Sequence, residues 1–153
     1  MRGRTRILLI ICCACVVIAG VVLAAIWRSD DAKVLPKASC GSATTHRLDG
    51  DTTILAADPG ALSCFQSAAR ACRSASIQLV EMGVDAGVTA VFTIDSGGAP
   101  CRGTEQNQDY SANSGGSAGQ VHSVSCGRIT VTSRGVTLSC GGQDVLIPAT
   151  VHS

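Results

Sequence analysis

The sequence predicts an α+β protein in which one N-terminal transmembrane helix is followed by a disulfide-braced extracytoplasmic domain. In that domain we expect a single helix packed on an antiparallel meander sheet of four or five strands. Three observations lead to this expectation: an uncharged apolar run near the N-terminus, six cysteines beyond it, and one helical pattern among segments of alternating polarity. A helix and a sheet that each have one apolar face bury those faces against each other, which gives a two-layer domain.

The apolar run extends from Ile7 to Trp27 without a charged residue. At about 1.5 Å per residue, a helix of this length spans the roughly 30 Å hydrocarbon core of a bilayer. Three arginines precede the run, and basic residues beside a span tend to remain in the cytoplasm. We therefore expect a single-pass protein of the cell membrane, with a cytoplasmic tail at 1–6, an anchor at 7–27 and the remaining chain outside the cytoplasm. The alternative is a signal peptide cleaved near Ala24, which would give a secreted protein.

Residues 28–50 have no sustained period and are assigned to a tether, which leaves 51–153 as the domain. Asp58 followed by Pro59 is typical of a helix start, since the carboxylate can cap the helix and proline is tolerated in the first turn. This helix should extend from Pro59 to about Arg73, with one face formed by a single set of residues. That set is Leu62, Phe65, Ala69 and Cys72.

Two hairpins are expected after the helix, with a further strand near 101–110 between them. In the first hairpin Leu79 should face Phe92, and in the second Val131 should face Leu138, because these pairings gather the apolar side chains on one face. Cys126 would then point outward unless the glycine that follows it forms a bulge.

The nine cysteines form two groups. Three lie in the apolar run, where a free thiol behaves as a small hydrophobic group. An even number of cysteines in a small extracytoplasmic domain is typical of a disulfide framework, so the other six should form up to three bridges. Zinc is the competing interpretation, but beyond the apolar run the chain has neither a C-x-x-C motif nor a paired histidine spacing, so we expect no metal or other cofactor. The six cysteines are Cys40, Cys64, Cys72, Cys101, Cys126 and Cys140.

For the pairing we expect Cys101 with Cys126, and one of Cys64 or Cys72 with Cys140. Cys40 would take the remaining helix cysteine. Six cysteines allow fifteen connectivities, so other pairings stay open at this point.

Two serine motifs suggest catalysis but lack the surroundings that it needs. The segment 95–101 resembles the nucleophile segment of chymotrypsin-like serine proteases, and 115–119 matches the G-x-S-x-G pattern of α/β-hydrolases. The first family needs a much larger two-barrel fold, and the second motif has meaning only in a tight turn between a strand and a helix. We assign no catalytic residue, and a small secreted serine hydrolase using Ser96 or Ser117 remains the alternative.

Three short phrases, at 82–85, 108–113 and 138–142, resemble phrases in uncharacterised small proteins of actinobacteria that are exported or anchored in the membrane. The resemblance covers roughly 60–148. It implies a single extracytoplasmic domain, and it implies neither an activity nor any site residue.

The leading functional hypothesis is an extracytoplasmic binding or accessory module held at the membrane, whose ligand and partner the sequence does not identify; an envelope protein is one candidate partner. Basic residues are not clustered, which argues against a nucleic-acid partner. Arg102, Tyr110 and Asn113 are the candidate binding residues, because Tyr and Arg are enriched at interface hot spots and a long polar loop follows Tyr110. A structural or assembly protein of the envelope is a further alternative.

Overall fold

The computed structural model describes residues 35–151 apart from 49–50, 84–85, 98–99 and 112–117. These residues belong to one compact unit, Leu35–Ser153. The expected cytoplasmic tail, the membrane anchor at 7–27 and the first part of the tether lie outside the described residues. Within the described part of the chain, no helix is both long and apolar enough to cross a bilayer.

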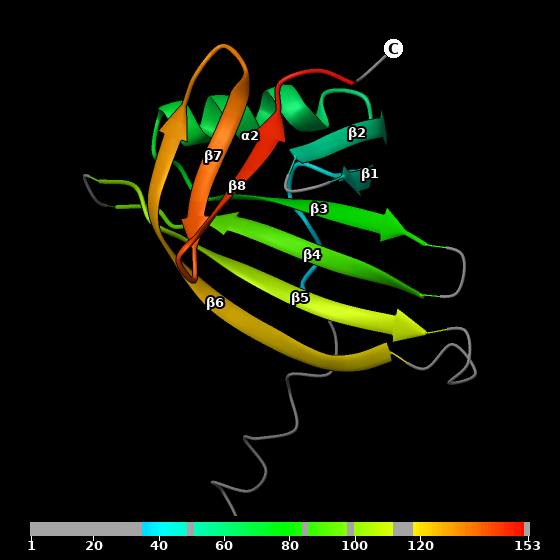
Figure 1. Cartoon of the computed structure of the whole chain (residues 1–153). Coiled ribbons are helices and arrows are strands. Elements are labelled where there is room, and N and C mark those ends of the chain that lie inside the picture. The colour runs from blue at the N-terminus through cyan, green and yellow to red at the C-terminus, as the bar shows by residue number, and fades with distance from the viewer. Residues whose placement is uncertain (1–34, 49–50, 84–85, 98–99, 112–117, 152–153) are drawn as a thin grey trace, which may run out of the picture. The chain divides into compact units, whose positions relative to one another are not determined.

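The described chain forms an eight-stranded sheet and one α-helix (Figure 1). In chain order the elements are β1 (Ser42–Leu48), β2 (Asp51–Ala57), α2 (Ala61–Arg70), β3 (Ala75–Met82), β4 (Ala86–Ile94), β5 (Gly103–Ser111), β6 (Ala118–Val131), β7 (Gly135–Cys140) and β8 (Gln143–Pro148).

The strand order in the sheet is β2-β1-β3-β4-β5-β6-β7-β8. Neighbouring strands are antiparallel except β1 and β3, which are parallel because β2 and α2 carry the chain back between them. The edge strands β2 and β8 contact each other, so the sheet curls into a nearly closed, barrel-like shape (Figure 1).

The expected two-layer fold, with one helix on a meander of four or five strands, is therefore wrong. The domain is mostly β, and its single described helix is short. Two strands account for much of the difference. β1 lies in the range expected to be the tether, and the sequence pattern predicts no strand at β8. A curled sheet buries its own concave face, so it needs far less cover from a helix than an open sheet does.

Helix α2 lies at one end of the curved sheet and contacts β3, β6 and β7 (Figure 1). Its buried face includes Leu62, Phe65 and Ala69, as the sequence pattern predicts. The helix is shorter than expected at both ends. It is preceded by Gly60 in a left-handed conformation (φ 79°), and Asp58 does not cap it but accepts hydrogen bonds from Ser42.

Both predicted hairpins form, each with a register two residues away from the expected one. Ile77 pairs with Phe92, and Ile129 pairs with Leu138. A shift of two residues leaves every side chain on the same face, so the apolar pattern alone does not distinguish the two registers. The register also shifts at Gly127, between Cys126 and Arg128, and this irregularity turns Cys126 inward.

All six cysteines of the domain form disulfides, which confirms the predicted framework. The bonds are Cys40–Cys64, Cys72–Cys101 and Cys126–Cys140.

The expected pairings of Cys101 with Cys126 and of a helix cysteine with Cys140 are wrong, whereas Cys40 does bond a helix cysteine. Cys126 and Cys140 are direct partners in the β6–β7 register, so their side chains lie next to each other and form a bond. The other two bonds tie the segments flanking β1 and β5 to the helix region, at Cys64 within α2 and Cys72 just after it.

Candidate functional site

A pocket opens in the concave interior of the curled sheet. Its cavity volume is about 80 Å³, enough for several water molecules or a small ligand. Six strands contribute to its wall, because alternate residues of each strand point toward the interior. The lining residues are Thr45, Thr52, Leu79, Glu81, Val88, Ala90, Phe92, Glu105, Asn107 and Val145.

Much of the pocket wall is apolar and continuous with the hydrophobic core. Leu79, Phe92 and Val145 are buried and belong to the core cluster in which the helix also packs. Val88 and Ala90 are half-buried and complete the wall on β4. The pocket is therefore a part of the core that no described side chain fills.

Glu105 and Asn107 form the polar pair of this wall. They are alternate residues of β5 and face the same side of the sheet, where they are directly opposite Phe92 and Ala90 in register. The Asn107 side-chain amide Nδ2 donates a hydrogen bond of 2.9 Å to Glu105 Oε1. Because a carboxylate accepts this bond, the amide must present its NH₂ group to Glu105 and its oxygen elsewhere.

The other half of the Asn107 amide lacks a partner. Asn107 Oδ1 is the buried side-chain polar atom without a hydrogen bond within the part of the chain that the structure describes. Leaving a buried acceptor unpaired costs about 1–3 kcal/mol, so an orphan of this kind indicates an interaction that forms when a ligand or water occupies the site.

Three further polar residues line the pocket. Glu81 enters from β3, and Thr45 and Thr52 enter from β1 and β2. Thr45 is the buried polar residue of the described core, only 4 % exposed. Two carboxylates thus share a small, partly apolar space, and none of the lining residues that the structure describes is Lys, Arg or His.

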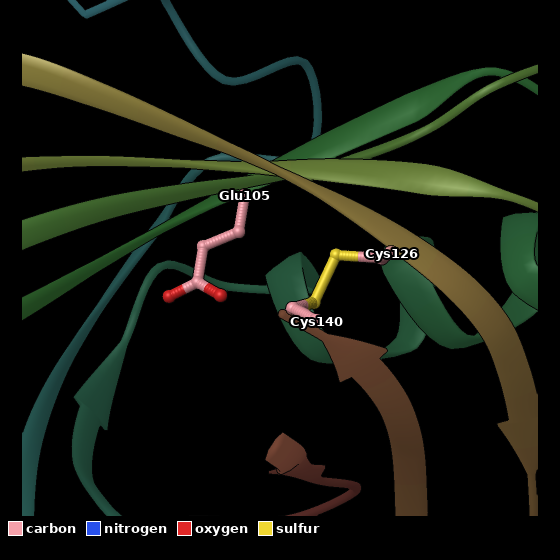
Figure 2. A group of neighbouring side chains, drawn as sticks. All are labelled: Glu105, Cys126 and Cys140. Carbon is pink, nitrogen blue, oxygen red and sulfur yellow. A yellow bond between two sulfur atoms is a disulfide. The ribbon is translucent and has the colours of Figure 1, made fainter. Parts of the chain in front are cut away.

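Glu105 also lies beside the Cys126–Cys140 disulfide, on the inner side of the sheet (Figure 2). One carboxylate oxygen and the two sulfurs are all within 4.8 Å of one another, which resembles the spacing of a metal-ligand set. The thiolate is the form of cysteine that binds metals, and both sulfurs here are bonded to each other. We therefore assign no metal to this group. Of its three residues, only Glu105 has a side chain that can still bind a ligand.

The structure does not bring the sequence-based binding residues together. Arg102 is exposed immediately before β5, whereas Tyr110 lies near the far end of the same strand, roughly 27 Å away at about 3.4 Å per residue. Asn113 lies outside the described residues.

Tyr110 has a clear structural role. It pairs in register with Gly87, and its hydroxyl donates to the Glu81 carbonyl oxygen at 3.4 Å. A Cβ atom added at Gly87 would overlap the Tyr110 hydroxyl group and ring, so the ring directly covers the glycine. Since Val88, the neighbour of Gly87, points into the pocket, Tyr110 packs on the outer face of the sheet.

The serine motifs occupy a turn and a range that is not described. Ser96 is exposed in the turn between β4 and β5, and Ser117 lies outside the described residues. Both described histidines, His46 and His122, are exposed on β1 and β6.

The sequence does not reveal the pocket, although it predicts a strand over Glu105 and Asn107. Spacing of two residues puts both on one face, but the intervening residues of β5 are also polar, so the sequence does not show which face is inside. No family model, curated protein or solved structure matches this chain. The pocket is therefore interpreted from its own geometry.

Proposed function

We propose that this chain is a membrane-anchored extracytoplasmic binding module whose ligand occupies the pocket inside the sheet. The observation that carries the proposal is the unpaired, buried Asn107 Oδ1 in a cavity that is mostly apolar and contains a few convergent polar groups. This combination is typical of small-molecule sites. The loop-side site at Arg102 and Tyr110 is replaced by this one, because those two residues are separated by the length of β5.

The location outside the cytoplasm is part of the proposal. It is supported by the apolar segment 7–27, which follows a basic tail, and by three disulfides, which persist mainly in oxidising compartments. Cleavage of the segment would leave the pocket unchanged and release the domain.

A binding role fits the pocket better than serine hydrolysis does. The described lining offers carboxylates, an amide and threonine hydroxyls, without a histidine to activate a hydroxyl nucleophile. The three disulfides cross-link strand segments and the helix region of the domain, and a rigid site loses little conformational freedom when it binds.

The test is a thermal-shift screen of the full-length chain in a nonionic detergent against small cations, anions and neutral compounds. Ala90→Leu places extra methyl groups in the pocket, and Thr89→Leu adds a similar side chain to the outer face of the same strand as the matched control. We expect at least one compound to raise the Tm of the wild type and of Thr89→Leu but not of Ala90→Leu. The proposal fails if no compound raises the wild-type Tm, or if Ala90→Leu responds as the wild type does.

A further inference from the structure

We propose that the ligand of this pocket is a small organic cation, consisting of a protonated amine on a short apolar body. This inference rests on the proposed function, since it names the class of molecule that the same pocket would bind. Three properties of the lining support it: its charge, its hydrogen-bonding groups and its apolar area.

The charge of the described lining is negative. Glu81 and Glu105 enter the pocket from β3 and β5, and no basic residue belongs to the described wall. Both carboxylates line the same small space, whose walls are partly apolar, so a positive charge there is favoured more strongly than it would be in bulk water. An anionic ligand would be repelled by the same two carboxylates.

The hydrogen-bonding groups of the pocket call for a donor. Asn107 donates its NH₂ group to Glu105 and presents a buried acceptor without a partner. The carboxylates are acceptors as well, and an ammonium group offers three donors and no acceptor. A primary ammonium can therefore satisfy Asn107 Oδ1 and a carboxylate oxygen at once, which a hydroxyl with its single donor cannot do.

The apolar wall argues for an organic cation over a metal ion. Calcium takes six to eight oxygen ligands, and magnesium requires near-ideal octahedral geometry. Phe92, Leu79 and Val145 occupy a large part of the wall and supply no such ligands. They can instead bury a short alkyl chain, at roughly 25 cal/mol for each Å² of apolar surface removed from water. The cavity of about 80 Å³ limits that chain to a few carbons.

The experiment compares three probes of nearly equal size by titration calorimetry on the full-length chain in nonionic detergent. They are n-butylammonium, n-butanol and n-butyrate, which are positive, neutral and negative. Each is measured with wild type, Glu105→Gln and Glu81→Gln. Asp95→Asn serves as the control for net charge, because Asp95 is exposed in the turn after β4 and outside the pocket.

We expect n-butylammonium to bind at least tenfold more tightly than n-butanol, and n-butyrate not to bind. A charge-assisted hydrogen bond is about twice as strong as a neutral one, so Glu105→Gln should weaken n-butylammonium roughly tenfold or more. Asp95→Asn should leave its affinity within about twofold, as expected for a distant exposed charge. The thermal midpoint of each variant is measured in parallel to verify that it is folded.

The outcomes separate the two proposals. If n-butanol or n-butyrate binds as tightly as n-butylammonium, and Ala90→Leu abolishes that binding, the pocket is a ligand site but the cation assignment is wrong. If n-butylammonium binds with equal affinity to wild type and to both glutamine variants, the assignment is also wrong. If none of the probes binds and the broader thermal-shift screen yields no ligand, the proposed function itself fails.

Discussion

Asn107 donates a hydrogen bond of 2.9 Å to the Glu105 carboxylate and keeps its own side-chain oxygen buried without a partner. The pair lies on the concave face of β5, opposite Ala90 and Phe92 of β4. Apolar side chains at these positions would extend the core, so we expect the domain to be less stable with the polar pair than with an apolar pair. Polar residues at positions where the fold would favour apolar ones are expected at functional sites.

Replacing Asn107 by leucine should increase stability and remove binding. The substitution eliminates an unpaired buried acceptor and adds apolar contacts in the pocket, while half-buried Glu105 keeps access to solvent. We expect the free energy of unfolding to rise by about 1 kcal/mol. Urea denaturation of the full-length chain measures this change. A loss of stability would mean that the Asn107–Glu105 bond is needed for folding and not retained for a ligand.

Tyr110 and Gly87 should be coupled across the outer face of the sheet. A methyl group at residue 87 would overlap the tyrosine ring, so Gly87→Ala should destabilise the fold by roughly 1–3 kcal/mol, as overpacking does. In the Gly87→Ala/Tyr110→Ala double variant the overlap is gone, and the cost of the alanine at residue 87 should largely disappear. A double-mutant cycle measured by denaturation gives the coupling energy directly. Additive effects would contradict the contact.

Each disulfide should contribute a similar amount to stability. The bonds join residues 24, 29 and 14 positions apart, and chain-entropy arguments then give roughly 3–4 kcal/mol for each bond. Replacing both Cys126 and Cys140 by alanine should therefore lower the free energy of unfolding by about 3 kcal/mol.

Non-reducing peptide mapping should recover the three pairs directly, and a peptide that joins Cys101 to Cys126 would contradict the structure.

Some elements of the fold can be predicted from the sequence and others cannot, for physical reasons. The buried face of α2 and the two hairpins follow from local periodicity, which the sequence displays. The register of each hairpin does not, because a slip of two residues preserves both faces. For Gly127 the sequence leaves two alternatives open, and the structure has the irregular one. Strand β1 is a long-range feature: it pairs in parallel with β3, and its inward residues are small or polar, as Ala43 and Thr45 illustrate.

The pocket cannot be predicted from the sequence, for a related reason. Glu105 and Asn107 are separated by Gln106, so β5 shows no alternation of polarity that would mark an inner face. Only the pairing with β4 and the curl of the sheet reveal that this polar face is the concave one. The disulfide framework, in contrast, follows from the even number of cysteines beyond the apolar run, whereas the pairing of Cys126 with Cys140 depends on the register of β6 with β7.

The contact between Asp58 and Ser42 predicts a pH dependence at the start of the sheet. The Ser42 main-chain N–H donates to Asp58 Oδ2 at 2.7 Å and the Ser42 hydroxyl donates at 3.0 Å. These bonds, the main-chain one first, hold the pKa of the Asp58 carboxyl below its ordinary value of 3.8. A carboxyl whose pKa is lower in the folded state stabilises the fold above the unfolded pKa, and this contribution is lost as the pH falls through the folded pKa.

The stability difference between wild type and Asp58→Asn should therefore be constant above about pH 5 and shrink in more acidic solution. Ser42→Ala removes the hydroxyl donor but keeps the main-chain donor, so in this variant the pKa of Asp58 should rise and still remain below 3.8. An NMR titration of the Asp58 carboxyl carbon in both proteins measures the two values. A pKa that does not change in Ser42→Ala would show that the hydroxyl makes no contribution, and one that reaches 3.8 would show that the main-chain bond makes none.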